Sequence, residues 1–283
     1  MQAEHRPPAA GCDNLAVSSL PFYVPAGPGR FQSTPATAGP WSPQAQHGGP
    51  PSALLVREFE RTAPDPGQRL ARIAVEILRP IPVSPVIVRA RVVRPGRRVI
   101  LLEGVVEVDG QEFVLARAWR IGRQATAPVA TPSHPPPPVP ADPNPERPDW
   151  PGAHLDGYLR AIEFRTTAGI FGKPGPAAVW TRSRSALVEG EEPSPMQRAA
   201  IVADSGSGVS QGVDLRRWAA VNVEMTLSAH RDPEGEWIHL DAHTVIGPDG
   251  TGRADAVLSD LAGPLGRAMQ TLTVAPLEGT SDG

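Results

Sequence analysis

Helical and alternating hydrophobic patterns occur in a similar order twice along this chain of 283 residues. In each half, an apolar run with the period of a helix precedes several segments rich in β-branched residues. Residues 73–77 and 221–225 open corresponding strand-rich stretches in the two halves. One helix set against an antiparallel meander is an α+β unit, so the pattern predicts an α+β fold in which this unit is made twice.

The first helix is predicted over residues 52–60, directly after two glycines and two prolines, because proline suits the first helical turn. The second is predicted from Ser194-Pro195 to Asp204, where the glycine-rich run 205–208 would stop it. The first-half strands are predicted as two short strands within 22–34 and four more near 70–79, 85–95, 98–109 and 111–122. The second-half strands are predicted near 159–167, 178–187, 219–230, 236–247, 251–260 and 265–275.

A proline-rich segment separates the two halves. About two residues in five are proline over 124–151, a composition that lacks ladder donors and favours polyproline II geometry. A connector is the main interpretation, and a docking site for a proline-recognising partner is the alternative. The predicted organisation is a disordered segment 1–19, a first unit 20–123, a linker 124–153, a second unit 154–276 and a tail 277–283.

Composition and charge exclude several classes of function. The net charge of -3 leaves no broad basic field, so nucleic-acid binding is not expected. Cys12 is the only cysteine, which fits a reducing, cytoplasmic location. No segment has the roughly 18 continuous apolar residues of a membrane span. The seven histidines show no metal-ligand spacing, so no metal site is predicted.

The two halves differ in their polar residues. When they are superimposed, Val56 falls on Asp204, Ala74 on Asn222 and Arg120 on Gln270. The trio of Asp, Asn and Gln occurs only in the second half, which predicts one active site per chain with the other half as scaffold.

Asp204 is the strongest candidate for chemistry. It would share the apolar helix face of Ala200 and Ile201, where a carboxylate is costly unless it is hydrogen-bonded. The macrodipole near a helix C-terminus also opposes its charge, which raises a pKa and makes a better base. The alternative is an aspartate that caps the following turn.

Asn222 and Gln270 lie on predicted strands, and each has a solvent-exposed alternative. Strict alternation would place Asn222 on the same face as Glu224 and Thr226. Gly48 and Gly49 lack Cβ atoms, so their N–H groups at a helix N-terminus could approach a substrate oxygen closely as oxyanion donors. Simple helix-start geometry is the alternative for these glycines.

Several motifs together resemble the acyl-CoA thioesterase II family, a group with the double hotdog fold. They are His47-Gly48-Gly49, Ile77-Leu78-Arg79-Pro80, Val202-Ala203-Asp204, Trp218 leading to Asn222 and His230-Arg231, Glu236-Trp237, and Ala268-Met269-Gln270-Thr271. The likeness covers most of residues 20–275 outside the linker. The double hotdog is therefore the expected architecture, with two tandem helix-wrapped antiparallel sheets in one chain.

The resemblance also implies a chemistry. In the family an Asp, a Thr or Ser, and a Gln position the attacking water, and Asp204 and Gln270 match the first and last. The hydroxyl position falls on Asn222, a departure from the pattern, because Asn can orient a water but cannot act as a nucleophile. The expected enzyme is a fatty acyl-CoA thioesterase of lipid metabolism.

The expected substrate pose follows from the same resemblance. The thioester carbonyl would face Gly48 and Gly49, the acyl chain would pass Ile201, and His47 would lie against the substrate. Arg79, Arg94, Arg97 and Arg98 lie near strand ends and could meet phosphates of coenzyme A, which enters as part of the substrate and not as a cofactor.

Two other functions stay open at this point. A non-catalytic acyl-CoA binding protein would have lost turnover through Asn222, and an enoyl-CoA hydratase would use His47 as its base. A homodimer or higher homo-oligomer could also form through exposed sheet edges.

Overall fold

The computed structural model describes residues 20–141 and 152–277. Within these residues, twelve strands form one antiparallel sheet in the order β1-β2-β4-β5-β6-β3-β9-β12-β11-β10-β8-β7. The first-half strands are β1 (Tyr23–Pro25), β2 (Arg30–Ser33), β3 (Gln68–Ile77), β4 (Pro85–Arg94), β5 (Val99–Val108) and β6 (Gln111–Gly122). The second-half strands are β7 (Ile162–Ala168), β8 (Ala177–Ser183), β9 (Trp218–Ala229), β10 (Ile238–Ile246), β11 (Thr251–Asp260) and β12 (Gly263–Pro276).

The strand order has the internal symmetry that the repeated sequence pattern predicts. Reading outward from the centre, β3, β6, β5, β4, β2 and β1 correspond to β9, β12, β11, β10, β8 and β7. The two halves join where β3 pairs with β9, over the register from Arg72↔Ser228 to Glu76↔Glu224. The halves therefore share one continuous sheet.

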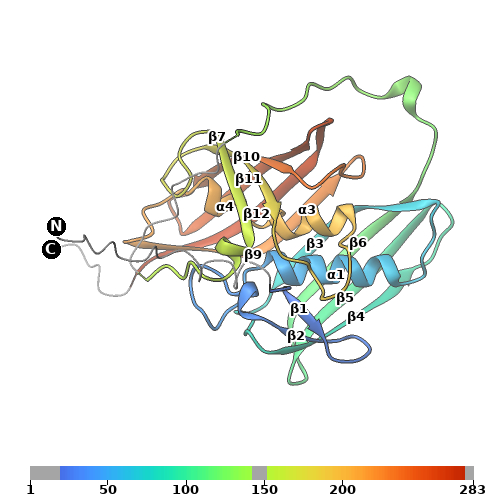
Figure 1. Cartoon of the computed structure of the whole chain (residues 1–283), viewed down its shortest axis with the longest axis horizontal. Coiled ribbons are helices and arrows are strands. Elements are labelled where there is room, and N and C mark those ends of the chain that lie inside the picture. The colour runs from blue at the N-terminus through green and yellow to red at the C-terminus, as the bar shows by residue number, and fades with distance from the viewer. Residues whose placement is uncertain (1–19, 142–151, 278–283) are drawn as a thin grey trace, which may run out of the picture.

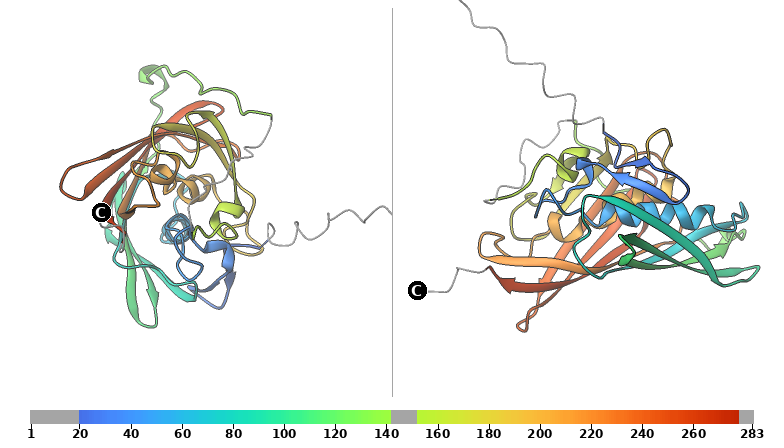
Figure 2. Two further views of the ribbon diagram at one scale, coloured as in Figure 1. Left: turned by 90° about the vertical axis from the view of Figure 1, so that its left-hand side faces the viewer. Right: turned by 90° about the horizontal axis from the view of Figure 1, so that it is seen from below.

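Two long helices fill the inside of this curved sheet. The helices α1 (Gly49–Arg61) and α3 (Pro195–Ala203) pack against each other, and the sheet curls around them (Figure 1; Figure 2, left). Ser194 caps α3 by accepting a hydrogen bond from the Gln197 N–H, 3.1 Å away. Because the helices are antiparallel, the N-terminus of α1 meets the C-terminus of α3, and this junction positions the site.

The fold prediction is confirmed, and the two long helices and most strands lie within a few residues of their predicted bounds. Two short α-helices were not predicted, and neither were the 3₁₀ helices at Pro35–Thr37 and Ala127–Val129. Residues 159–161, predicted as strand, belong to the helix α2 (Tyr158–Ala161). The helix α3 ends before the run 205–208 as predicted, but most of that run forms a separate short helix, α4 (Gly206–Val209). The strand β8 ends at Ser183, four residues earlier than predicted, and residues 186–189 instead bond to Phe22 and Tyr23 at the start of β1.

The described part of the linker lies along the second half of the sheet and arches over the molecule in Figure 1. The Trp180 indole N–H donates to the Pro137 carbonyl at 2.8 Å, and Arg165 donates to the carbonyls of Pro140 and Ala141. The predicted disorder of 1–19, most of the predicted tail and linker residues 142–151 lie outside the described residues. No helix of the described part is long and apolar enough to cross a membrane.

Candidate active site

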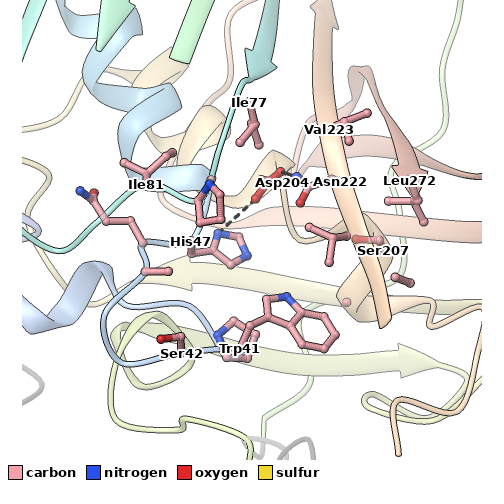
Figure 3. Close-up of a pocket in the computed structure, with 18 of the residues that line it drawn as sticks. Trp41, Ser42, His47, Ile77, Ile81, Asp204, Ser207, Asn222, Val223 and Leu272 are labelled. Atoms are coloured by element: carbon pink, nitrogen blue, oxygen red, sulfur yellow. Dashed lines mark hydrogen bonds and ion pairs between the residues drawn. The ribbon is translucent and has the colours of Figure 1, made fainter. Parts of the chain in front are cut away.

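A pocket of about 480 Å³ opens where the N-terminus of α1 meets the C-terminus of α3 (Figure 3). Its walls come from both halves of the chain and are mainly apolar. Side chains on the wall include Trp41, His47, Ile77, Leu78, Arg79, Ile81, Asp204, Ser207, Gln211, Leu215, Val221, Asn222, Val223, Thr244 and Leu272. An apolar pocket with a few convergent polar groups is the usual form of a small-molecule site.

Asp204 is the buried carboxylate on this wall, and it is only 5% exposed. It follows the last residue of α3, where its carboxylate Oδ1 accepts hydrogen bonds from Asn222 Nδ2 and, at 3.0 Å, from Gln270 Nε2. The Gly48 N–H also donates to this carboxylate. Burial raises the pKa of Asp204 to about 7, although the hydrogen bonds from Gln270, Gly48 and Asn222 oppose the increase.

Asn222 reaches Asp204 because β9 contains an irregularity. Asn222 pairs with Leu272 and Glu224 pairs with Thr271, so Val223 has no cross-strand partner. Such a bulge changes which face the side chains point to. Asn222 therefore bonds to Asp204 inside the sheet, while Glu224 bonds to Thr271 on the other face, and the predicted shared face of Asn222 and Glu224 is wrong.

Gln270 lies behind Asp204 and not on the pocket wall. It is 1% exposed, and its Nε2 donates to both the backbone carbonyl and the carboxylate of Asp204, at 2.8 and 3.0 Å. Its Oε1 accepts from the Ser207 N–H at 2.8 Å. All of these bonds hold the turn between α3 and α4, so Gln270 fixes the carboxylate from the protein side.

Gly48 and Gly49 allow the two helix ends to come together. A Cβ on Gly49 would lie 2.0 Å from the Ile201 carbonyl oxygen, and one on Gly48 would lie 2.7 Å from Asp204 Oδ2. Both N–H groups are bonded within the protein, Gly48 to Asp204 and Gly49 to His47 Nδ1 at 3.1 Å. Pro50 and Pro51 supply no further donors, so the predicted oxyanion donors are already engaged.

His47 lies directly beside Asp204 on the pocket wall, with Nδ1 3.3 Å from Oδ2 (Figure 3). Burial lowers the pKa of His47 to about 3, so the ring is neutral. Because Nδ1 accepts the Gly49 N–H, the ring proton belongs on Nε2. The ring also stacks on Tyr158, with centroids 3.6 Å apart and planes 2° from parallel.

Comparison with known proteins decides the family. The family model described as the acyl-CoA thioesterase N-terminal domain matches residues 37–121, and that of the C-terminal domain matches residues 134–274. The chain belongs to the acyl-CoA thioesterase family. The first match contains His47 and Gly48, and the second contains Asp204, Asn222 and Gln270.

Solved structures agree with this family at the level of the fold. A candidate thioesterase from Novosphingobium aromaticivorans superimposes with a TM-score of 0.69 at 18% identity, covering 90% of this chain and 99% of the other. A candidate thioesterase II from Thermobifida fusca gives 0.66 at 19% identity, covering 92% and 97%. Acyl-CoA thioesterase II TesB2 from Mycobacterium marinum gives 0.63 at 14% identity, covering 90% and 94%. No curated protein sequence matches significantly.

Of the predicted substrate contacts in this acyl-CoA thioesterase family member, Arg79 lines the pocket and Ile201 does not. Ile201 does not line the pocket, because it is fully buried in the core between the helices and the sheet. Arg79 does line it, with its guanidinium over the Phe113 ring and Nη1 donating to Gln111 at 2.8 Å. Arg97 and Arg98 lie beside the other end of β3, a strand's length away, which is roughly 30 Å for ten residues.

Sequence reasoning missed Tyr158, Ser207 and Gln211. Tyr158 contacts His47, and the other two line the pocket. Tyr158 enters from the residues after the linker, and no periodicity links it to the second helix. Its rarity is the one available signal, because the chain has only two tyrosines.

Proposed function

We propose that this protein hydrolyses acyl-CoA thioesters by direct attack of a water molecule that Asp204 activates. The observation that carries the proposal is a buried carboxylate on the wall of an apolar pocket, with burial raising the pKa of Asp204 to about 7. A general base works best when its pKa lies near the working pH. Membership of the acyl-CoA thioesterase family supports the same reaction.

In the proposed reaction, Asp204 takes one proton from the water as the water oxygen bonds to the thioester carbonyl carbon. The tetrahedral intermediate then collapses, the carbon–sulfur bond breaks, and the thiolate receives the proton from Asp204. The products are a carboxylic acid and coenzyme A, and the reaction needs no cofactor.

Asn222 and Gln270 have different tasks in this mechanism. Asn222 lines the pocket and donates to Asp204, so its amide holds the carboxylate and can also contact the water. Gln270 anchors Asp204 from behind. As Asp204 takes the proton, its attraction for the Gly48 N–H weakens, and this amide becomes available to the developing oxyanion.

The test is thiol release from a series of acyl-CoAs, from acetyl to palmitoyl, by the wild type and Asp204→Asn. Asp241→Asn is the matched control, because Asp241 is an exposed aspartate on β10 outside the pocket. The proposal predicts turnover by the wild type and the control, and a loss of about 100-fold or more in kcat for Asp204→Asn.

Other results would contradict the proposal and favour the alternatives. Acyl-CoA binding without turnover, rescued by Asn222→Thr, would indicate a binding protein. Loss of the enoyl absorbance of crotonyl-CoA without thiol release would indicate a hydratase. Unchanged kcat in Asp204→Asn would remove Asp204 from the mechanism.

A further inference from the structure

Tyr158 reaches the site from a segment that has no part in either predicted helix. After the linker, the chain returns to the first half, where the N–H groups of His154 and Tyr158 donate to the carbonyls of Pro40 and Ala38 at 2.9 and 2.8 Å. The approach is close, since a Cβ on Gly157 would lie 2.2 Å from the Ala38 oxygen. This contact presents the fully buried Tyr158 side chain to the helix junction.

The Tyr158 hydroxyl bonds to the chain on both sides of Asp204. It donates to the Ile201 carbonyl at 2.9 Å and lies 2.8 Å from Ser205 Oγ. Ile201 belongs to the last turn of α3, where carbonyls lack partners within the helix. Ser205 follows Asp204 directly, so one hydroxyl fixes the residues on either side of the carboxylate.

The Tyr158 ring fixes the residue that faces the same carboxylate. It stacks in parallel on His47, 3.6 Å between centroids, and Phe22 stacks against Tyr158 at 6.4 Å. His47 in turn lies 3.3 Å from Asp204. One side chain thus contacts the backbone that carries Asp204 and the imidazole opposite it.

We propose that Tyr158 is a positioning residue for catalysis, whose hydroxyl holds the Asp204 turn and whose ring holds His47 against Asp204 and keeps water away from the pair. This inference rests on the proposed thioesterase function for its kinetic consequences. Its structural half, the placement of His47, can be measured without any activity.

The hydroxyl and the ring have separable effects. Tyr158→Phe keeps the stacking and loses the two hydroxyl contacts, so the turn carrying Asp204 gains freedom. Tyr158→Leu also loses the ring, so water can reach His47 and Asp204. The pair consists of His47 before α1 and Asp204 after α3. Among the described residues, the other titratable groups at the site are Tyr158 on α2, which contacts His47, and Arg79 elsewhere on the pocket wall.

The kinetic experiment compares both variants with Thr181→Val. Thr181 is fully buried on β8 and donates to the Ile238 carbonyl at 2.8 Å, so its variant also loses one buried hydroxyl-to-carbonyl bond, but outside the pocket. Tyr158→Phe is expected to lower kcat about tenfold with little change in KM, because small misplacements of a catalytic group are costly. Thr181→Val is expected to keep kcat within about twofold, whatever stability it loses.

The pH profile separates positioning from a merely structural role. Tyr158→Leu should move the acid limb of kcat/KM to lower pH, because hydration favours the charged carboxylate, whereas Tyr158→Phe should leave the limb in place. Equal losses of kcat in Tyr158→Phe and Thr181→Val, or an acid limb that Tyr158→Leu does not move, would overturn the proposal.

Nuclear magnetic resonance of labelled histidine gives the independent measurement. His47 should stay neutral between about pH 5 and 8 in the wild type and in Tyr158→Phe, and should titrate closer to its ordinary pKa in Tyr158→Leu. If His47 titrates in this way but the protein releases no thiol from any acyl-CoA, the placement of His47 by Tyr158 stands and the proposed function fails. If His47 titrates alike in all three proteins, the placement by Tyr158 is wrong.

Discussion

The carboxylate of Asp204 is buried and accepts hydrogen bonds from three groups of the protein. Gln270, Gly48 and Asn222 each favour its charged form, yet burial dominates and holds the pKa of Asp204 at about 7. The result is a carboxylate that is partly ionised at neutral pH. Asn222, where the family's pattern has a hydroxyl residue, keeps a donor toward this carboxylate.

Asn222 can be tested by removing or replacing its donor. Asn222→Ala removes one bond that favours ionised Asp204, so the pKa of Asp204 rises further and the acid limb of kcat/KM moves up by about one unit. Activity at pH 7 should fall and should recover in part near pH 9. Asn222→Thr, which can still donate a hydrogen bond, should keep the acid limb of kcat/KM near its wild-type position. Identical pH profiles for Asn222→Ala and Asn222→Thr would contradict the role of Asn222 as a donor to Asp204.

Asp204 should also lower stability as the pH rises. The pKa of Asp204 is about 7 in the folded protein and near 3.8 in the unfolded chain, so the folded state holds the proton more tightly. The stability that Asp204 contributes is therefore fully present below about pH 3.8 and is lost as the pH rises through 7. Between pH 5 and 8 the loss is on the order of 3 kcal/mol. Urea unfolding of Asp204→Asn at both pH values should lack this decrease, and parallel pH dependence in the two proteins would contradict it.

At the scale of elements, the site depends on two helix ends that meet through glycine. The sequence predicts both helices because prolines and a serine cap mark where each begins. It does not predict α2 and α4, since four residues are too few to show a helical period. The bulge in β9 could not be predicted from the sequence either, because strict alternation places every second residue of a strand on the same face of the sheet.

Gly49→Ala should separate these helix ends. The added Cβ would overlap the Ile201 carbonyl, which is backbone and cannot turn aside. A shift of α1 against α3 should cost about 1–3 kcal/mol of unfolding free energy, and kcat should fall as His47 moves from Asp204. Gly122→Ala, where the nearest atom is 3.4 Å away, is the control, and equal effects of the two substitutions on thermal unfolding would contradict this packing.

At the scale of the whole molecule, two halves of similar architecture contribute to one site. Asp204, Asn222 and Gln270 come from the second half, while His47 and Gly48 come from the first. The sequence predicts the trio because only one half carries it. It cannot predict Tyr158, whose contact with His47 depends on how the chain returns after the linker.

The shared sheet and core predict cooperative unfolding. The buried apolar residues of both halves form one cluster, and β3 pairs with β9 across the junction. Leu55→Ala on α1 and Leu258→Ala on β11 should each cost about 2–5 kcal/mol and lower the midpoint of the same single transition. Two calorimetric transitions, each sensitive to one substitution, would show that the halves unfold independently.

The pH dependence of kcat/KM for the wild-type protein tests the central claim most directly, since it reports the essential base of the free enzyme. The measurement is thiol release from the best acyl-CoA substrate at low substrate concentration from pH 5 to 9. With Asp204 as the base, kcat/KM should rise tenfold per pH unit at acid pH and level off above a pKa of about 7. An acid limb of kcat/KM with its midpoint near the ordinary pKa of an exposed aspartate, or a kcat/KM that does not change from pH 5 to 9, would contradict the claim that Asp204 is the base.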